Sequence, residues 1–317
     1  QPSTPAPMSP HPLLHLSPEV AAARDQGRPI VALESTIIAH GMPWPENLGM
    51  AREVEALIRS EGAAPATIAV MDGRICIGLS DSELQRLARA ESVMKLSRRD
   101  LPYAVATGQL GATTVAATMI CAHLAGIEVF VTGGIGGVHR GAETSFDISA
   151  DLQELARTPV AVVCAGAKAI LDLSLTLEYL ETHGVPVISV GQLNFAAFYT
   201  PDSGLPADFR LDTAEAQARF IRTQWALGLN AGVVVSNPVP DEAAMPRADM
   251  DRYIQQALQE AGQRGIHGKA VTPFLLTRIK ELSGGRSLAT NIALVQHNAV
   301  VGARLARALQ QSSGNAG

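Results

Sequence analysis

The stretch from Glu128 to Lys168 constrains the fold of this chain more than any other. It holds two apolar runs, Val129–Val131 and Val160–Cys164, and each ends in a turn of small residues. The first turn is Thr132–Arg140, with four glycines, and the second is Ala165–Lys168. Apolar runs with little alternation are typical of strands covered on both faces of a parallel sheet. Glycines after such strands let the backbone approach a ligand closely.

The same pattern recurs along the chain. Further strands are predicted at Ile30–Leu33, Val93–Leu96, Val187–Val190 and Ala231–Val235, and Asp72-Gly73 predicts a hairpin between the runs on either side of it. Helices are predicted over Ser17–Gln26, Glu46–Ser60, Ser80–Arg89, Arg99–Thr107, Thr113–Ala125, Ile170–Thr182, Thr213–Leu227, Asp249–Gln263, Pro273–Leu282 and Ser287–Leu309. This order predicts an α/β fold in one domain, with a mostly parallel sheet flanked by helices on both faces.

The domain is expected to occupy residues 17–309. Residues 1–16 are rich in Pro, Ser and His and predict a disordered lead-in, since they lack the basic start and apolar core of a secretion signal. Residues 310–317 predict a flexible tail. Asn194–Pro206 is expected to be a surface loop whose Phe195, Phe198 and Tyr199 cover a pocket.

Composition narrows the class of protein. A hydrophobic content of 47% allows a sizeable core, and the net charge of -5 is mild. Without a cluster of Lys and Arg, the sequence argues against a nucleic-acid partner. No apolar run is long enough for a membrane span. The three cysteines have no CxxC spacing, which favours buried thiols in a reducing, cytoplasmic compartment over disulfides or zinc.

Polar or glycine-rich segments lie at or just past most of the predicted strands. They are Glu34, Lys95, Gly133–Arg140, Lys168, Gln192 and Ser236-Asn237. Because the carboxyl ends of parallel strands lie at one edge of the sheet, ligands bind there in open α/β folds. The sequence therefore predicts a site at this edge.

Lys168 is the strongest candidate for chemistry within that set. It follows three small residues, and a lysine becomes a nucleophile when burial or a second cation lowers its pKa. Lys95 is a candidate for that second cation. The alternative is a surface lysine at a helix start, but a cation is poorly placed there against the helix dipole. We favour the functional interpretation.

Other polar residues admit two interpretations. Asp147 and Asp151 lie four apart around Ser149 and could bind a hard cation such as Mg²⁺ or Mn²⁺, although spacing alone favours a helix cap. His139 next to Arg140 could bind an anion, whereas a lone histidine is more often structural.

The segment Gly111–Thr114 is predicted to begin a helix, and free amides there could bind a sugar phosphate. A threonine cap is an equally good interpretation.

The glycines of Gly133–Gly137 match neither GxGxxG nor a P-loop, so close backbone packing is about as good an explanation as a phosphate site. For Asn291 and His297, the default interpretation is a hydrogen bond in the core or between the helix and solvent. The residues alone indicate an α/β enzyme and are compatible with a lysine imine on a phosphorylated sugar.

Long collinear motifs make the family identifiable. They are VALESTIIAHGMP (Val31–Pro43), ATIAVMDGRICIGLS (Ala66–Ser80), KLSRRDLP (Lys95–Pro102), GATTVAATMICAHLAGI (Gly111–Ile127), VFVTGGIGGVHRGAE (Val129–Glu143), DISADLQELARTPVAVVCAGAK (Asp147–Lys168), LTLEYLETHGVPV (Leu175–Val187), FYT (Phe198–Thr200) and VTPFLL (Val271–Leu276). With these motifs the chain resembles the pseudouridine-5′-phosphate glycosidase family from about Ala22 to Leu309. Gly191–Asp208 and Asp249–Gly262 resemble it least.

The resemblance implies reversible cleavage of the C1′–C5 bond of pseudouridine 5′-phosphate to uracil and ribose 5-phosphate, through a lysine imine with the ring-opened ribose. It implies a carbon–oxygen lyase of the hydro-lyase class, a divalent cation, typically Mn²⁺ with Mg²⁺ as the alternative, and a homotrimer. The residue roles that it implies are nucleophile for Lys168, proton donor for Glu34, metal ligand for Asp147, and substrate contacts for Lys95, Val115, Ser149, Ala150 and Asp151, with His139 and Asn291 lining the site.

Other functions stay open at this point. A related imine-forming enzyme on another sugar phosphate would share all these residues. A non-catalytic sugar-phosphate binding protein is disfavoured by intact Glu34, Lys95 and Lys168. A nicotinamide-dependent oxidoreductase is weaker still, because no GxGxxG follows a strand.

Overall fold

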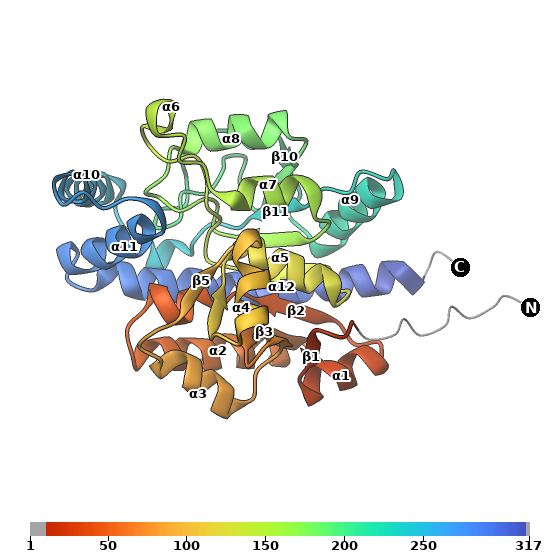
Figure 1. The fold of residues 1–317 in the computed structure, drawn as a ribbon. Coiled ribbons are helices and arrows are strands. Elements are labelled where there is room, and N and C mark those ends of the chain that lie inside the picture. The colour runs from red at the N-terminus through yellow and green to blue at the C-terminus, as the bar shows by residue number, and fades with distance from the viewer. Residues whose placement is uncertain (1–10, 315–317) are drawn as a thin grey trace, which may run out of the picture.

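The computed structural model describes residues 11–314, and their strands form one sheet (Figure 1). Along the sheet the order is β1-β4-β3-β2-β7-β8-β11-β9-β10, with β6 pairing to β3 and β5. The strands are β1 (Leu14–Leu16), β2 (Ile30–Leu33), β3 (Ala64–Met71), β4 (Arg74–Ile77), β5 (Met94–Leu96), β6 (Gly111–Thr113), β7 (Val129–Val131), β8 (Ala161–Cys164), β9 (Val187–Ser189), β10 (Phe209–Arg210) and β11 (Val233–Ser236).

The sheet is mostly parallel, as the sequence predicts. Every pair in the central run β3-β2-β7-β8-β11-β9 is parallel, and only β3–β4 and β3–β6 are antiparallel. The β3–β4 hairpin turns at Asp72 (φ 52°) and Gly73 (φ 78°), two positive φ values in succession. Such a pair is typical of a tight hairpin turn, which confirms the prediction from Asp-Gly.

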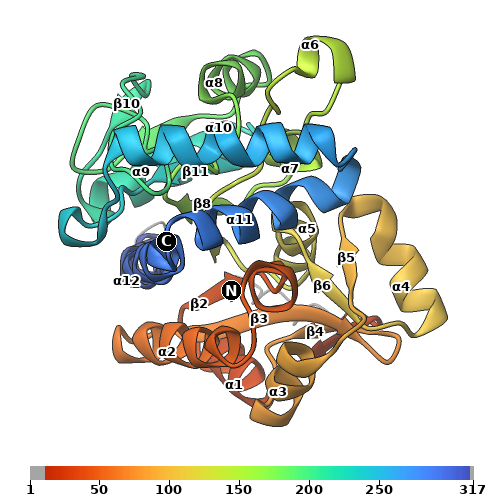
Figure 2. The ribbon, with the colours of Figure 1, turned by 90° about the vertical axis from the view of Figure 1, so that its left-hand side faces the viewer.

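Helices cover both faces of the sheet. They are α1 (Pro18–Asp25), α2 (Glu46–Ser60), α3 (Asp81–Arg89), α4 (Leu101–Thr107), α5 (Val115–Leu124), α6 (Ala142–Ser145), α7 (Ala150–Arg157), α8 (Leu173–Thr182), α9 (Ala214–Ala226), α10 (Arg247–Gln263), α11 (Val271–Leu282) and α12 (Arg286–Gly314). Figure 2 looks along α12, which packs on β2, β7 and β8 between α2 and α9, while α5 lies across the strands from it. A Cβ on Gly302 would come within 2.2 Å of the Val131 side chain, so this glycine lets α12 approach the sheet closely.

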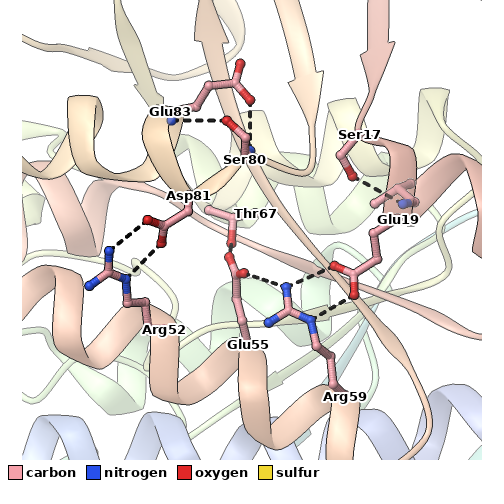
Figure 3. Close-up of polar contacts among 10 residues, drawn as sticks. Ser17, Glu19, Arg52, Glu55, Arg59, Thr67, Ser80, Asp81 and Glu83 are labelled. Atoms are coloured by element: carbon pink, nitrogen blue, oxygen red, sulfur yellow. Dashed lines mark hydrogen bonds and ion pairs between the residues drawn. The ribbon is translucent and has the colours of Figure 1, made fainter.

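Polar contacts hold the helices α1, α2 and α3 in place beside strand β3 (Figure 3). Arg59 of α2 donates to Glu19 of α1 and to the buried Glu55, which also accepts from Thr67 of β3 at 2.8 Å. Burial raises the pKa of Glu55, and the Thr67 hydroxyl and Arg59 oppose that rise. Further hydrogen bonds are the Ser80–Glu83 capping box that begins α3 and the bidentate pair Arg52–Asp81.

Two expectations at the ends of the domain are wrong. Leu14–Leu16 is not a disordered lead-in but strand β1, which pairs in parallel with β4. At the other end, α12 continues past Leu309 to Gly314, so the tail expected from residue 310 is helical over most of its length. Both segments gain backbone or packing partners that are distant in sequence. The remaining parts of the expected lead-in and tail, 1–10 and 315–317, lie outside the described residues.

Two internal segments also differ from expectation. Gly111–Thr113 is strand β6, and the helix that follows begins at Val115 with Thr114 as its cap. The segment Asn194–Pro206 is an irregular loop, as expected, with Asp202, Gly204 and Pro206 exposed, but Phe195, Phe198 and Tyr199 are all buried. Phe198 and Tyr199 each line a cavity, and Phe195 packs in the core.

The remaining sequence expectations concern thiols and membranes. All three cysteines are buried and unpaired, as expected, and burial raises the pKa of Cys121 and Cys164 to about 12. Between residues 11 and 314, no helix combines the length and the apolarity that crossing a membrane requires.

Candidate active site

The site lies where the parallel strands end. Glu34 directly follows β2, Lys95 lies in β5, and Lys168 comes four residues after β8. Pairing continues past the strands: Ile135 bridges to Ala167, and the amide of Lys168 donates to the carbonyl of Ile135 at 3.1 Å. The glycine-rich turn after β7 thus runs beside the turn that carries Lys168, and the backbone fixes the base of that lysine.

Two connected cavities meet at these residues. We call the narrower one the inner chamber; it is lined by Glu34, Thr36, Ile37, His40, Gly41, Lys95, Gly133, Gly134, Lys168, Phe198, Thr272, Pro273, Leu276 and Asn291. The other, the outer cleft, has a volume of about 480 Å³, and its lining includes Ser97, Arg98, Arg99, Val115, Gly136, His139, Asp147, Ser149, Ala150, Asp151 and Lys269. Glu34, Thr36, Lys95, Lys168 and Thr272 line both.

The carboxylate of Glu34 is buried and firmly held. The hydroxyl of Thr36 donates to one of its oxygens, and the hydroxyl of Thr132 donates to the other. Hydrogen bonds at both oxygens satisfy this buried carboxyl group and fix its direction. Neither threonine was singled out from the sequence, although Thr36 stands two residues after Glu34 in the motif LEST.

The two lysines are electrostatically coupled. Burial first, and then the charge of Lys168, lower the pKa of Lys95 to about 8, while Asp151 and Glu34 act in the opposite direction. The ammonium of Lys168 makes no hydrogen bond or ion pair with any residue from 11 to 314. A lysine amine without a fixed partner, beside a second cation, is available for attack on a carbon centre.

Asp151 joins two turns of the site. One carboxylate oxygen accepts from the amide of Ala116 at 2.9 Å, and the other accepts from the amide of Gly136 at 2.8 Å. Ser149 caps α7 through the amide of Asp151, which confirms the cap interpretation for this serine. In this structure the carboxylate of Asp151 is therefore occupied by the backbone, and it holds the glycine turn to the start of α5.

The glycine at position 136 is required by this arrangement. A Cβ there would lie 2.3 Å from Oγ of Ser149 and 2.6 Å from Oδ2 of Asp151. Real Cβ atoms do not approach so closely, so a side chain would push α7 away from the turn. Close backbone packing thus accounts for this part of the Gly133–Gly137 run.

Asp147 and His139 face the outer cleft together. Nδ1 of His139 lies 3.9 Å from a carboxylate oxygen of Asp147. Burial lowers the pKa of His139, Asp147 raises it, and the charges of Lys168 and Lys95 lower it further. The ring is therefore biased towards the neutral form.

The donors around Asp147 fit a hydrated cation and not a closed metal cage. Within the described part of the chain, no three His, Cys, Asp or Glu side chains are grouped as metal ligands. The carboxylate of Asp147 is 40% exposed, and Mg²⁺-like ions are often held by one or two carboxylates, several waters and substrate phosphates.

Asn291 reaches the inner chamber from α12. Its Oδ1 is buried and has no hydrogen-bond partner among the described residues, and it lies near Gly133. Val115, Ser149 and Ala150 line the outer cleft, so every residue to which the family resemblance assigns a role borders one of the two cavities.

Three strand-end residues considered from the sequence lie outside both cavities. Ser236 accepts from the amide of Ala196, Asn237 donates to Asn298, and Gln192 donates to the carbonyls of Asn194 and Pro201. Their roles in the fold are structural. His40 and Lys269 border the cavities and were not predicted. His40 lies close to Glu34 in sequence but carries no signal of its own, and Lys269 is brought there by a segment far away in sequence.

Lysines and a buried carboxylate at the strand ends of a parallel sheet are typical of α/β enzymes that act on small anionic substrates. Comparison with known proteins places the chain more narrowly. Residues 19–308 match the family model described as indigoidine synthase A like protein. A pseudouridine-5′-phosphate glycosidase from Cupriavidus pinatubonensis is 70% identical over 300 residues, covering 95% of this chain and 96% of that protein. The chain therefore belongs to the indigoidine synthase A-like family that contains the pseudouridine-5′-phosphate glycosidases.

Solved structures agree with this placement. A prealnumycin C-glycosynthase in complex with ribulose 5-phosphate is 39% identical, with a TM-score of 0.89 over 96% of this chain and 99% of that one. An indigoidine synthase A-like protein from Thermotoga maritima is 33% identical, with a TM-score of 0.86 over 94% and 97% of the two chains. The fold expected from the sequence is thus the fold of the family.

Proposed function

We propose that this chain is a pseudouridine-5′-phosphate glycosidase, which converts pseudouridine 5′-phosphate and water reversibly to uracil and ribose 5-phosphate. The observation that carries the proposal is the meeting of Glu34, Lys95 and Lys168 at the junction of two cavities. The 70% identity with a glycosidase of that name supports the choice of substrate.

The cavities divide the substrate between them. Lys95, Arg98, Arg99 and Lys269 line the outer cleft, as do Ser149 and Ala150 at the start of α7. Cations and a helix N-terminus suit a phosphate group. The inner chamber has an apolar wall that includes Phe198 and Leu276, which suits a flat base. The ribose then spans the junction, where Glu34 and Lys168 lie.

The chemistry begins with opening of the ribose ring. The neutral amine of Lys168 attacks C1′, the C1′–O4′ bond breaks, and the electron pair goes to O4′, which takes a proton from Glu34. Hydroxyls of Thr36 and Thr132 hold Glu34 in place for this transfer. The attack leaves the Lys168 nitrogen cationic, and it passes one proton back to Glu34, so the product is a secondary amine that still carries the base on C1′.

Cleavage of the carbon–carbon bond follows. C5 of the base takes a proton, the C1′–C5 electron pair returns to the ring, and uracil leaves. The lone pair of the Lys168 nitrogen forms the C1′=N imine at the same time. Water then adds to C1′, and ribose 5-phosphate and the free lysine are released. Asp147, with His139 beside it, would hold a hydrated Mn²⁺ or Mg²⁺, which supplies charge compensation for the phosphate.

Two further proposals follow from the family resemblance. We place the enzyme among the hydro-lyases, because in the direction of synthesis the reaction cleaves a C1–O bond of ribose 5-phosphate and eliminates water. We also propose a cytoplasmic homotrimer. The 84% exposure of Phe146, next to Asp147 at the rim of the outer cleft, supports an apolar contact there. Light scattering of the purified protein tests the trimer, and a monomeric mass would contradict it.

The direct test is turnover. Purified protein with Mn²⁺ and pseudouridine 5′-phosphate should release uracil and ribose 5-phosphate in equal amounts, as measured by chromatography. Glu34→Gln should lower kcat by about 10²–10⁴-fold, and Lys168→Ala should abolish turnover. If folded wild-type protein releases no uracil, the proposal is wrong.

A second candidate has a specific observation in its favour. The C-glycosynthase noted above, 39% identical to this chain, was solved with ribulose 5-phosphate. A related reaction on another sugar phosphate or base would use the same junction. Turnover of a panel of C-nucleoside phosphates, with uracil and other bases offered in the reverse direction, separates the two candidates.

A further inference from the structure

His40 is a wall residue of the inner chamber that the proposed chemistry does not use. Its Nε2 lies 2.9 Å from the carbonyl oxygen of Val93. A carbonyl oxygen can only accept, so Nε2 carries a proton. In the neutral ring Nδ1 is then a hydrogen-bond acceptor. Nδ1 is buried and has no partner among residues 11–314.

The surroundings of His40 keep the ring neutral. Burial lowers its pKa most, and the charges of Lys95 and Lys269 lower it further, against a smaller rise from the hydrogen bond with Val93. A neutral ring with Nε2–H engaged leaves Nδ1 as its one polar atom without a partner. The fold therefore holds an acceptor ready in the wall of the chamber.

A second unpaired acceptor lies in the same chamber. Oδ1 of Asn291 is buried without a partner in the described chain, and Asn291 comes from α12, a different element from the segment that carries His40. Much of the remaining wall is apolar, with Ile37, Phe198 and Leu276. Buried acceptors are costly when unpaired, so the ligand of this chamber is expected to be a flat molecule that carries N–H donors.

We propose that Nδ1 of His40 accepts a hydrogen bond from a ring N–H of the nucleobase, and that His40 and Asn291 together select a base with two free N–H groups. This inference rests on the function proposed above. It adds a specificity residue to that function, in the wall of the inner chamber.

The pair of acceptors explains how a carbon-linked nucleotide is distinguished from a nitrogen-linked one. Uracil attached through C5 keeps both N1–H and N3–H. Uracil attached through N1, as in uridine 5′-phosphate, keeps only N3–H. When uridine 5′-phosphate enters a site with two buried acceptors, one acceptor stays unpaired. The cost of that unpaired acceptor makes the site reject uridine 5′-phosphate.

Two substitutions at His40 separate recognition from structure. In His40→Asn the amide oxygen occupies the place of Nδ1, and the bond to Val93 is lost. In His40→Gln the amide nitrogen occupies the place of Nε2 and keeps that bond, while the acceptor at Nδ1 is lost. We expect kcat/KM for pseudouridine 5′-phosphate to fall about tenfold or more in His40→Gln and to be largely retained in His40→Asn.

Isosteric product analogues identify the hydrogen bond. The probes are uracil, 2,6-dihydroxypyridine, in which C–H replaces N1–H, and 4-hydroxy-2-pyridone, in which C–H replaces N3–H, each as an inhibitor of wild type and of His40→Gln. Wild type should bind uracil about tenfold more tightly than at least one analogue, and His40→Gln should lose that preference. Thermal unfolding of both variants checks that they fold.

The outcomes keep the two proposals apart. Absence of uracil release by wild type would overturn the proposed function itself. Normal turnover by wild type, with retained activity in His40→Gln and loss in His40→Asn, would show that His40 serves only to hold Val93 and would overturn the inference. Equal inhibition of wild type by all three compounds would overturn it as well.

Discussion

Lys95 and Lys168 lie at the same junction of the two cavities, and the charge of Lys168 is, after burial, the largest cause that lowers the pKa of Lys95, to about 8. Like charges in one partly dry site disfavour each other, and Lys95 is the lysine whose pKa is lowered by this coupling.

The pH dependence of substrate binding follows from that pKa. Lys95 is cationic below about pH 8 and neutral above it, whereas an arginine at this position stays charged. We expect kcat/KM of wild type, relative to that of Lys95→Arg, to fall as the pH rises through about 8. The measurement is kcat/KM for both proteins between pH 6 and 10. A ratio independent of pH would contradict a phosphate-binding role for the Lys95 cation.

The stability of the protein should also depend on the protonation of Lys95, but it should rise with pH where kcat/KM falls. The pKa of Lys95 is about 8 in the folded chain and 10.5 when unfolded, so between these values the unfolded state binds more protons and stability rises with pH. Below pH 8 the folded protein therefore carries the cost of a buried cation. Lys95→Met should raise the Tm by about 2 °C or more at pH 7, and this gain should vanish above about pH 10. A lower Tm at pH 7 would contradict it.

The ion pair Arg98–Glu154 borders the outer cleft, and we expect it to contribute substantially to the free energy of unfolding. Glu154 is buried, accepts two hydrogen bonds from Arg98 at 2.8 and 2.7 Å, and also accepts from Thr158. Arg98→Met leaves a buried carboxylate without its cation, so the free energy of unfolding should fall by about 2 kcal/mol or more. Urea denaturation measures it.

The neighbouring Arg99 provides a matched control. Its side chain is 83% exposed, and its contact with Asp100 is 3.9 Å long. Arg99→Met should change the free energy of unfolding by less than about 0.5 kcal/mol. Equal effects of the two substitutions would show that the Glu154 pair contributes nothing specific.

The contact between Gly136 and Asp151 predicts a third stability effect. A side chain at position 136 overlaps Ser149 and Asp151, so Gly136→Ala should cost about 1–3 kcal/mol and lower kcat/KM about tenfold or more by displacing the turns of the site. Gly262 lies inside α10, where an added Cβ would meet no atom within 4 Å outside its own helix backbone, so Gly262→Ala should stabilise by up to about 1 kcal/mol. Full activity in Gly136→Ala would show that the turn tolerates the shift.

Much of the fold was predictable because its signals are local. The apolar runs at Ile30–Leu33 and Val129–Val131 are strands with those bounds, and helix Glu46–Ser60 also has its predicted bounds. Since the strands are parallel, the meeting of Glu34 and Lys168 at one edge followed from chain order alone.

The features that could not be predicted from the sequence depend on contacts between residues far apart in the chain. β1 and β6 are three residues long, too short for a periodic signal, and each exists because another strand pairs with it. Thr132 reaches Glu34 across 98 positions. His40 is recognisable as a site residue only from its place in the lining of the inner chamber and its unpaired Nδ1.

The central claim is that Lys168 forms an imine with the sugar. The measurement is incubation of the protein with ribose 5-phosphate and borohydride, followed by peptide mass spectrometry, since borohydride reduces an imine to a stable amine. The account predicts one pentose phosphate adduct on the peptide that contains Lys168, and none in Lys168→Ala. Absence of an adduct on Lys168 in folded protein supplied with Mn²⁺ would contradict it.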